Sequence, residues 1–122
     1  MLQEPKSIRA FIGAKDFGLS REFYRTLGFV EKRVSADMSV FSLNEYSFYL
    51  QDYYVKSWVK NSMMFLEVGD LNSVWDKLLT MDLTSKFRNV KLSPPVERDW
   101  GKEFFIHDPS GILWHIGEFT KK

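Results

Sequence analysis

The sequence predicts an α+β protein made of two similar halves, each with the order strand, helix and three strands (βαβββ). Three observations support this prediction: an internal repeat, an amphipathic helical pattern in each half, and short strand-like segments separated by turn residues. Such halves form curved mixed sheets with their helices outside, and neither sheet can bury its concave face alone. We therefore expect a cleft between the halves or against a second chain, and that cleft is the natural ligand site.

The internal repeat has an offset of 54 residues. Phe11 and Asp16 of the first half are matched by Phe65 and Asp70 of the second. Each aspartate follows a strand-like run and precedes a helix-like run. Because a carboxylate in this place accepts hydrogen bonds from free backbone N–H groups, we interpret both aspartates as helix caps rather than catalytic groups.

The first half continues with a helical run over 18–27, in which Leu19, Phe23 and Leu27 lie on one face. Gly28 then ends the helix, as glycine commonly does. The strand-like segments that follow cover 29–35, 38–43 and 46–51.

The second half has a helical run over 71–81, with an apolar face that includes Leu71 and Leu78. The strand-like segments that follow cover 90–92, 103–107 and 112–119. Pro94-Pro95 makes the first of these an edge or irregular strand, and the turn at 108–111 separates the other two.

We expect residues 1–122 to form a single domain whose halves, about 6–51 and 61–119, are joined by 52–60. The joining segment, DYYVKSWVK, is too aromatic for a flexible linker. We expect its residues Tyr53, Tyr54, Val55 and Trp58 to pack against the protein or against a second copy of it.

The composition excludes several classes of function. Seventeen basic and sixteen acidic residues leave a net charge of +1, so neither nucleic acid nor a membrane surface is expected as a partner. The absence of cysteine excludes disulfides and thiolate metal sites. No apolar run suits a membrane span or a signal peptide, which favours a cytoplasmic location. Aromatic residues form 16% of the chain, enough for a core and for a ring-lined pocket.

Two stretches resemble the vicinal oxygen chelate superfamily, which includes glyoxalase I, extradiol dioxygenases and the fosfomycin- and bleomycin-resistance proteins. They are KDFGLSREFYRTLGF at 15–29 and WGKEFFIHDPSGILWHIGE at 100–118. The Trp-Gly-x-Glu-Phe start of the second is most similar to the bleomycin-resistance branch. For this branch the resemblance implies a homodimer with two clefts that bind a drug without chemistry.

The resemblance also implies four metal-ligand positions, which fall on Arg9, Tyr49, Met63 and His115. Arginine stays protonated, and methionine sulfur is too soft for the metals of this superfamily. We therefore expect no metal and no cofactor. The weak catalytic candidates that remain are His115 and Tyr49. The sequence therefore leaves open whether the protein is an enzyme, and we favour a protein without catalytic activity. For His107 we expect a surface or turn role.

Strand alternation predicts the side chains that face the cleft. With two tryptophans as rim candidates, the expected ligand-binding residues are Arg9, Phe11, Tyr49, Trp58, Met63, Phe65, Trp100 and His115. A surface of rings and few polar groups suits a flat aromatic compound. Arg9 has two open roles: it anchors a carboxylate or phosphate of the ligand, or it forms an internal ion pair with Glu67 or another carboxylate of the cleft.

Three functions remain. The first is a metal-free binding protein that sequesters an aromatic or polycyclic compound, with antibiotic resistance as one use. The resemblance makes bleomycin itself a poor ligand, because those binders are thought to use an acidic cleft for a cationic drug and this cleft contains Arg9. The second is a metal-dependent or histidine-based lyase, isomerase or dioxygenase. The third is an interaction module, whose partner would cover 53–58.

Overall fold

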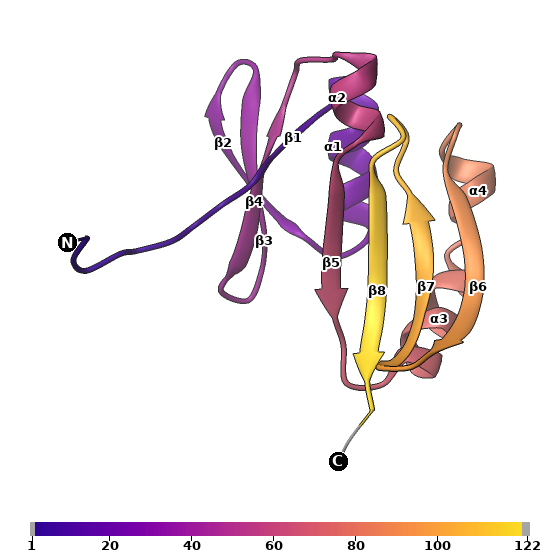
Figure 1. Cartoon of the computed structure of the whole chain (residues 1–122). Coiled ribbons are helices and arrows are strands. Elements are labelled where there is room, and N and C mark those ends of the chain that lie inside the picture. Colours follow the sequence, from indigo (N-terminus) through magenta and orange to yellow (C-terminus); the bar gives the residue numbers. More distant parts are fainter. Residues whose placement is uncertain (1, 121–122) are drawn as a thin grey trace.

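The computed structural model describes residues 2–120 and contains two βαβββ modules, each with one four-stranded sheet (Figure 1). The first module consists of β1 (Phe11–Gly13), α1 (Phe17–Thr26), β2 (Val30–Ser35), β3 (Met38–Leu43) and β4 (Tyr46–Gln51). The second consists of β5 (Met63–Glu67), α3 (Leu71–Thr80), α4 (Leu83–Lys86), β6 (Lys91–Arg98), β7 (Gly101–His107) and β8 (Leu113–Phe119). The predicted α+β class is confirmed.

The two sheets have the same topology. Their strand orders are β1-β4-β3-β2 and β5-β8-β7-β6. In each sheet the first strand pairs in parallel with the last strand of its module, and the other neighbours are antiparallel. We call these sheet 1 and sheet 2.

Both helices of the repeat begin at the predicted caps. Asp16 Oδ1 accepts from the backbone N–H of Leu19, and Asp70 Oδ1 accepts from that of Ser73, each at 3.1 Å. These bonds satisfy donors that the first turn of a helix otherwise leaves free. The capping interpretation of both aspartates is confirmed.

Three details differ from the sequence prediction or add to it. A short helix, α2 (Lys56–Lys60), and the single turn α4 form where the sequence analysis assigned no helix. Strand β6 continues through both prolines, as the edge strand of sheet 2 with a register shift between Ser93 and Val96. Since an edge strand has no ladder on its outer side, it tolerates residues without an N–H.

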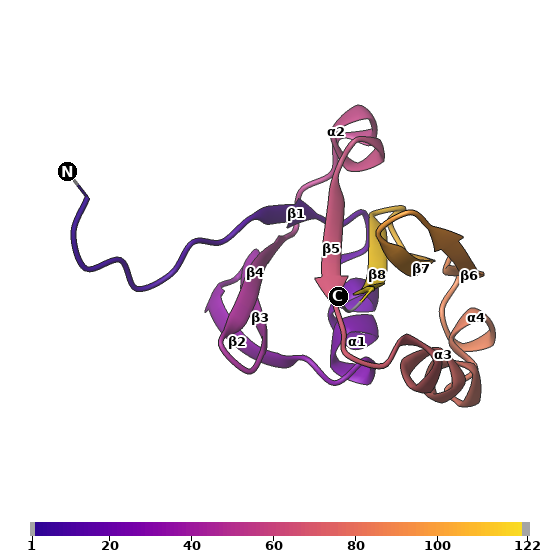
Figure 2. The same ribbon diagram turned by 60° about the horizontal axis from the view of Figure 1, so that its bottom comes forward.

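Helix α1 packs between the two sheets. Figures 1 and 2 both place it between them, while α3 and α4 cover one face of sheet 2 in Figure 2. The buried ring of Tyr24 on α1 packs against Phe41 and Phe48 of sheet 1 and against Trp114 of sheet 2. The core of the molecule is therefore shared by both modules.

A buried polar group joins the modules inside this core. The Tyr24 hydroxyl donates to Asp108 Oδ2 at 2.6 Å and accepts from Trp114 Nε1 at 2.9 Å. The other Asp108 oxygen accepts from the backbone N–H groups of Ser110, Gly111 and Ile112, each at 2.9 Å. One carboxylate thus fixes both the 108–111 turn and the contact between the modules.

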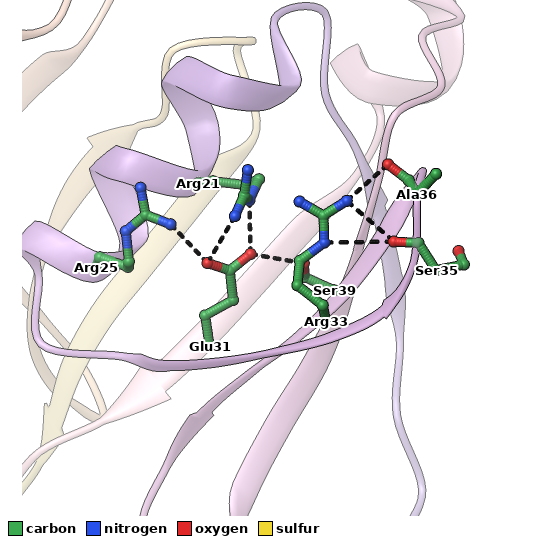
Figure 3. Close-up of polar contacts among 7 residues, drawn as sticks. All are labelled: Arg21, Arg25, Glu31, Arg33, Ser35, Ala36 and Ser39. Atoms are coloured by element: carbon green, nitrogen blue, oxygen red, sulfur yellow. Dashed lines mark hydrogen bonds and ion pairs between the residues drawn. The ribbon is translucent and has the colours of Figure 1, made fainter.

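On the other side of α1, Glu31 binds the helix to sheet 1 (Figure 3). It accepts from Arg21 at 2.6 and 3.2 Å, from Arg25 at 2.6 Å and from Ser39 Oγ at 2.6 Å. Burial alone would raise the pKa of Glu31, but these hydrogen bonds lower it to about 2.

Over residues 2–120, no helix has the length and apolar character that crossing a membrane requires.

Candidate functional site

The first candidate surface lies on the face of sheet 1 turned away from the core. There Phe11 stacks on Tyr49 with ring centroids 4.7 Å apart, and Phe11 remains 45% exposed. Arg9 Nη1 donates to the Tyr49 hydroxyl at 3.0 Å, and Arg9 Nε donates to Ser47 Oγ at 2.8 Å. Arg9 precedes β1, which begins at Phe11. We call Arg9, Phe11, Ser47 and Tyr49 the Arg9 cluster.

The Arg9 cluster carries positive charge without a carboxylate. Among the described residues Arg9 forms no ion pair, so the internal pair with Glu67 is not made within the chain. The strand register puts Lys32 on the same face, because Lys32 pairs with Val40 and Val40 pairs with Tyr49. This face of sheet 1 therefore suits an anionic group.

The second candidate surface lies on the corresponding face of sheet 2. His115 Nδ1 donates to Glu103 Oε1 at 2.8 Å, and His115 Nε2 lies 3.4 Å from Met63 Sδ. The imidazole stacks on Phe65 and meets Phe105 edge-on, with centroids 6.1 and 5.1 Å apart. We call Met63, Phe65, Glu103, Phe105 and His115 the His115 cluster.

Glu103 is the buried member of the His115 cluster. Only 7% of its side chain is exposed, and its second oxygen accepts from Arg98 Nε at 2.9 Å. Burial would raise the pKa of Glu103, but the hydrogen bonds from His115 and Arg98 outweigh it, so the pKa lies below its usual value. The carboxylate thus stays ionised and orients the imidazole with Nε2 towards Met63 Sδ.

Aromatic side chains extend this surface along sheet 2. Phe65 contacts Trp100 and Phe119, with centroids 5.7 and 5.8 Å apart. Gly117 lies directly beneath Phe65, where a Cβ would come within 2.4 Å of the Phe65 ring. A hollow of about 550 Å³ lies beside Phe65 and is also lined by Tyr46 and Glu67.

The structure groups the predicted ligand-binding residues into two clusters rather than one. Arg9, Phe11 and Tyr49 lie together on sheet 1, whereas Met63, Phe65, Trp100 and His115 lie together on sheet 2. Over residues 2–120, no hydrogen bond, ion pair or ring contact joins the two clusters. Trp58 belongs to neither, because it lies on α2, where its ring meets Tyr53. Tyr53, Tyr54, Val55 and Trp58 are all more than a third exposed within the chain.

A larger hollow, of about 730 Å³, lies at the beginning of α1 and is lined by Lys15, Asp16, Asp52 and Arg88 among others. It contains none of the predicted ligand-binding residues. Size alone therefore does not locate the candidate site. We take as candidates the two sheet faces with exposed rings, of which the sheet 1 face also has the unpaired Arg9.

The residues present do not fit a divalent metal. Within the described chain, no group of three or more histidine, cysteine, aspartate or glutamate side chains could hold one. The four positions that the superfamily resemblance assigns to ligands pair off as Arg9 with Tyr49 and Met63 with His115. This donor set offers one good nitrogen ligand, and no reaction step through a metal follows from it.

Sequence reasoning missed Glu103 and Arg98. Alternation in β7 and pairing across the 108–111 hairpin put Glu103 on the same face as His115, two rungs away from a direct pair. Strand alternation thus indicates the face on which Glu103 lies, but it does not indicate whether the carboxylate is buried or solvated. His107, expected at the surface or in a turn, ends β7 and is half-buried.

No family model matches the chain, and no curated protein matches it either. Solved structures are similar in fold. A bleomycin-binding protein from Streptomyces verticillus, complexed with copper(II)-bleomycin, has a TM-score of 0.78 at 18% identity, covering 98% of this chain and 100% of that one. A bleomycin resistance determinant encoded on the transposon Tn5 has a TM-score of 0.79 at 15% identity, covering 94% and 99%. A lactoylglutathione lyase from Agrobacterium tumefaciens has a TM-score of 0.66 at 15% identity, covering 94% and 95%.

Proposed function

Starting from the fold of the glyoxalase and bleomycin-binding structures, which this chain shares, we propose that the protein binds a small aromatic or polycyclic compound without a metal. The observation that carries the proposal is the exposed ring stack of Phe11 and Tyr49 beside the unpaired Arg9. Stacking provides affinity for a flat ring, at roughly 0.5–1.5 kcal/mol per ring pair beyond area burial. Sequestration of a toxic compound, and hence antibiotic resistance, is one use of such binding.

The ligand in this proposal is an aromatic anion. Arg9 presents a planar fork of donors that matches a carboxylate, sulfonate or phosphate. Lys32 on the same face adds a second positive charge. Bleomycin is the named ligand of two of the structural neighbours, but we do not propose it as the ligand of this chain.

We further propose that a homodimer completes the site. A ligand held only by the Arg9 cluster or only by the His115 cluster would be open to solvent on one side. In a symmetric dimer the Arg9 cluster of one chain faces the His115 cluster of its partner. The exposed residues of 53–58 and the exposed Ile8, in the segment that extends from the body of the molecule in Figure 1, offer apolar surface for this contact.

The ligand class can be tested with two fluorescent probes that share a ring system. 1-Anilinonaphthalene-8-sulfonate carries a sulfonate, and N-phenyl-1-naphthylamine does not. We expect Arg9→Gln to weaken binding of the sulfonate about tenfold and to leave the neutral probe unchanged, since one charged hydrogen bond is lost. Lys77→Gln, at an exposed position of α3, is the matched control. Equal loss of both probes would overturn the anchoring role of Arg9.

The absence of a metal is tested by elemental analysis of protein purified without chelators or nickel affinity. The proposal predicts less than a stoichiometric amount of manganese, iron, nickel and zinc, and no rise in Tm when each is added. A stoichiometric metal would overturn the proposal and would favour the alternative of a metal-dependent enzyme.

A second function is favoured by the Glu103–His115 pair. Because Nδ1 donates to Glu103, the neutral imidazole would have its acceptor nitrogen at Nε2, which is the arrangement of a general base. In an isomerase of this kind, a proton would pass from a substrate carbon to Nε2 and return to a substrate carbon, with no other reagent consumed.

The isomerase alternative predicts solvent deuterium exchange at a carbon next to a carbonyl, with phenylpyruvate as an aromatic anionic probe. The exchange rate should exceed the buffer rate and fall in both His115→Gln and Glu103→Gln. Exchange at the buffer rate in the unmodified protein would reject this alternative for that probe class and leave the binding proposal standing.

A further inference from the structure

We propose that a second site, outside the two clusters, binds an anion of the phosphate class. It is a hollow of about 270 Å³ lined by Lys15, Asn89, Lys91, His107 and Ser110, with the ring of Tyr54 at its edge. It lies at the end of the molecule where the 108–111 turn meets the beginnings of α1 and β6. The Arg9 cluster contributes nothing to it.

The fold holds the two halves of this hollow on rigid elements. On one side, β6 pairs with β7 so that Lys91 lies directly opposite His107. On the other side, the backbone N–H of Lys15 donates to Ser110 Oγ at 2.8 Å, and Lys15 Nζ lies 5.6 Å from the centre of the Tyr54 ring. The turn that carries Ser110 is fixed by its three bonds to Asp108. The site is therefore formed before any ligand arrives.

The positive charge of the hollow is not compensated. No carboxylate lines it, and among the described residues neither Lys15 nor Lys91 takes part in an ion pair. The adjoining hollow shares Tyr54, Ser110 and Gly111 and adds two more lysines, Lys56 and Lys60.

Three carboxylates on neighbouring segments, Asp16, Asp52 and Asp108, do not line this hollow. Asp16 binds Arg88 at 2.6 Å and caps α1, and Asp108 is buried against Tyr24. Asp52 shares the neighbouring larger hollow with Lys15, but among the described residues the two side chains form no ion pair. None of the three therefore neutralises the pair formed by Lys15 and Lys91.

His107 supplies an independent observation. Its Nδ1 is buried and has no hydrogen-bond partner among the described residues. A buried polar atom without a partner is rare in folded proteins and commonly marks a bound water, ion or ligand. Burial is the main cause that lowers the pKa of His107, and the charge of Lys91 lowers it further.

These groups match a tetrahedral oxyanion better than a metal cation or an apolar molecule. Two ammonium groups supply charge, while the Asn89 amide, the Ser110 hydroxyl and the His107 ring supply neutral hydrogen bonds. The chemistry is shared by free phosphate and by the phosphate group of a small phosphomonoester. The Tyr54 ring at the edge gives a reason to compare the two.

The two histidines of the chain make the site testable by NMR. Their ring C–H signals should be followed at constant ionic strength while sodium phosphate, phenyl phosphate or sodium chloride is added. We expect the His107 signals to shift saturably with both phosphates and not with chloride. Inorganic phosphate has no ring to stack on the aromatic clusters, so the His115 signals serve as the internal reference in that titration. If phenyl phosphate binds more tightly than inorganic phosphate, the ligand of this site is a phosphomonoester. If the two bind equally, the ligand is free phosphate.

Variants separate this site from the proposed ligand site. Lys15→Gln and Lys91→Gln should each weaken phosphate binding about tenfold, since each removes one charged contact. Lys77→Gln, at an exposed position of α3, should leave the phosphate-dependent shift of His107 unchanged. An unperturbed His107 in the unmodified protein, or equal shifts in the Lys15→Gln/Lys91→Gln double variant, would overturn the inference. Either result would leave the probe experiments on Arg9 unaffected.

Discussion

At the scale of single residues, Glu31 links the charge state of the protein to its stability. Its folded pKa of about 2 lies below the ordinary value of 4.5, so its contribution is complete above about pH 4.5 and is lost as the pH falls towards 2. We expect Glu31→Gln to cost about 1–3 kcal/mol at pH 7 and to flatten the loss of stability between pH 5 and 2.

Urea denaturation at several pH values measures both effects of Glu31→Gln. Glu22→Gln, at an exposed position of α1, is the control and should change stability by less than about 0.5 kcal/mol. If the two variants show the same pH dependence, the contacts of Glu31 with Arg21 and Arg25 do not contribute to stability as argued.

Tyr24 is the residue whose hydroxyl joins the modules. In Tyr24→Phe the ring packing remains, but the buried Asp108 and Trp114 each lose a hydrogen-bond partner. We expect a loss of roughly 1–3 kcal/mol in the free energy of unfolding. Tyr46→Phe, at a position 66% exposed, should have little effect in the same denaturation experiment. Similar values for the two variants would contradict a structural role for the hydroxyl.

Individual residues also show which contacts could be predicted from the sequence and which could not. The caps Asp16 and Asp70 followed from local chemistry, because a capping bond reaches only three residues along the chain. The partner of His115 did not, because Glu103 lies on another strand and its burial depends on Arg98 from a third. Pairing of this kind is determined by sheet register, which a single sequence specifies weakly.

At the scale of elements, Asp70 controls the beginning of α3. Removing its side chain in Asp70→Ala frees a backbone donor and should cost about 0.5–2 kcal/mol. Asp70→Ser should restore most of this loss, since serine is also a good cap. The comparison is made by thermal and urea denaturation, and equal destabilisation by alanine and serine would show that capping is not the cause.

The elements that the sequence pattern missed are the short ones. Helices α2 and α4 contain five and four residues, too few to display an amphipathic period. They form because buried anchors, Val59 on α2 and Leu83 on α4, fix them to the core. By contrast, the edge position of β6 followed from Pro94-Pro95, because proline removes a ladder donor wherever it occurs.

At the scale of the whole molecule, the repeat was sufficient to predict two equivalent sheets. It was not sufficient to predict which faces meet, because alternation assigns a side chain to a face without saying what lies opposite it. The separation of the Arg9 cluster from the His115 cluster is a property of the three-dimensional arrangement of the modules.

The proposed homodimer makes a specific prediction about mixed variants. Arg9→Gln and Phe65→Ala should each weaken binding of 1-anilinonaphthalene-8-sulfonate when present alone. If each site takes the Arg9 cluster from one chain and the His115 cluster from its partner, a heterodimer of the two variants contains one intact site. Unfolding and refolding a mixture should therefore restore part of the binding, as measured by titration. No restoration, or a monomer in sedimentation, would contradict the shared site.

The single hydroxyl between the modules also bears on the history of the chain. At the repeat offset of 54 residues, the position of Tyr24 is occupied in the second half by Leu78, a buried apolar side chain on α3. If the halves descend from one duplicated ancestor, they have since become non-interchangeable, since only one helix can reach Asp108 and Trp114. A chain assembled from two copies of the first half would bury two phenols and have neither partner for them.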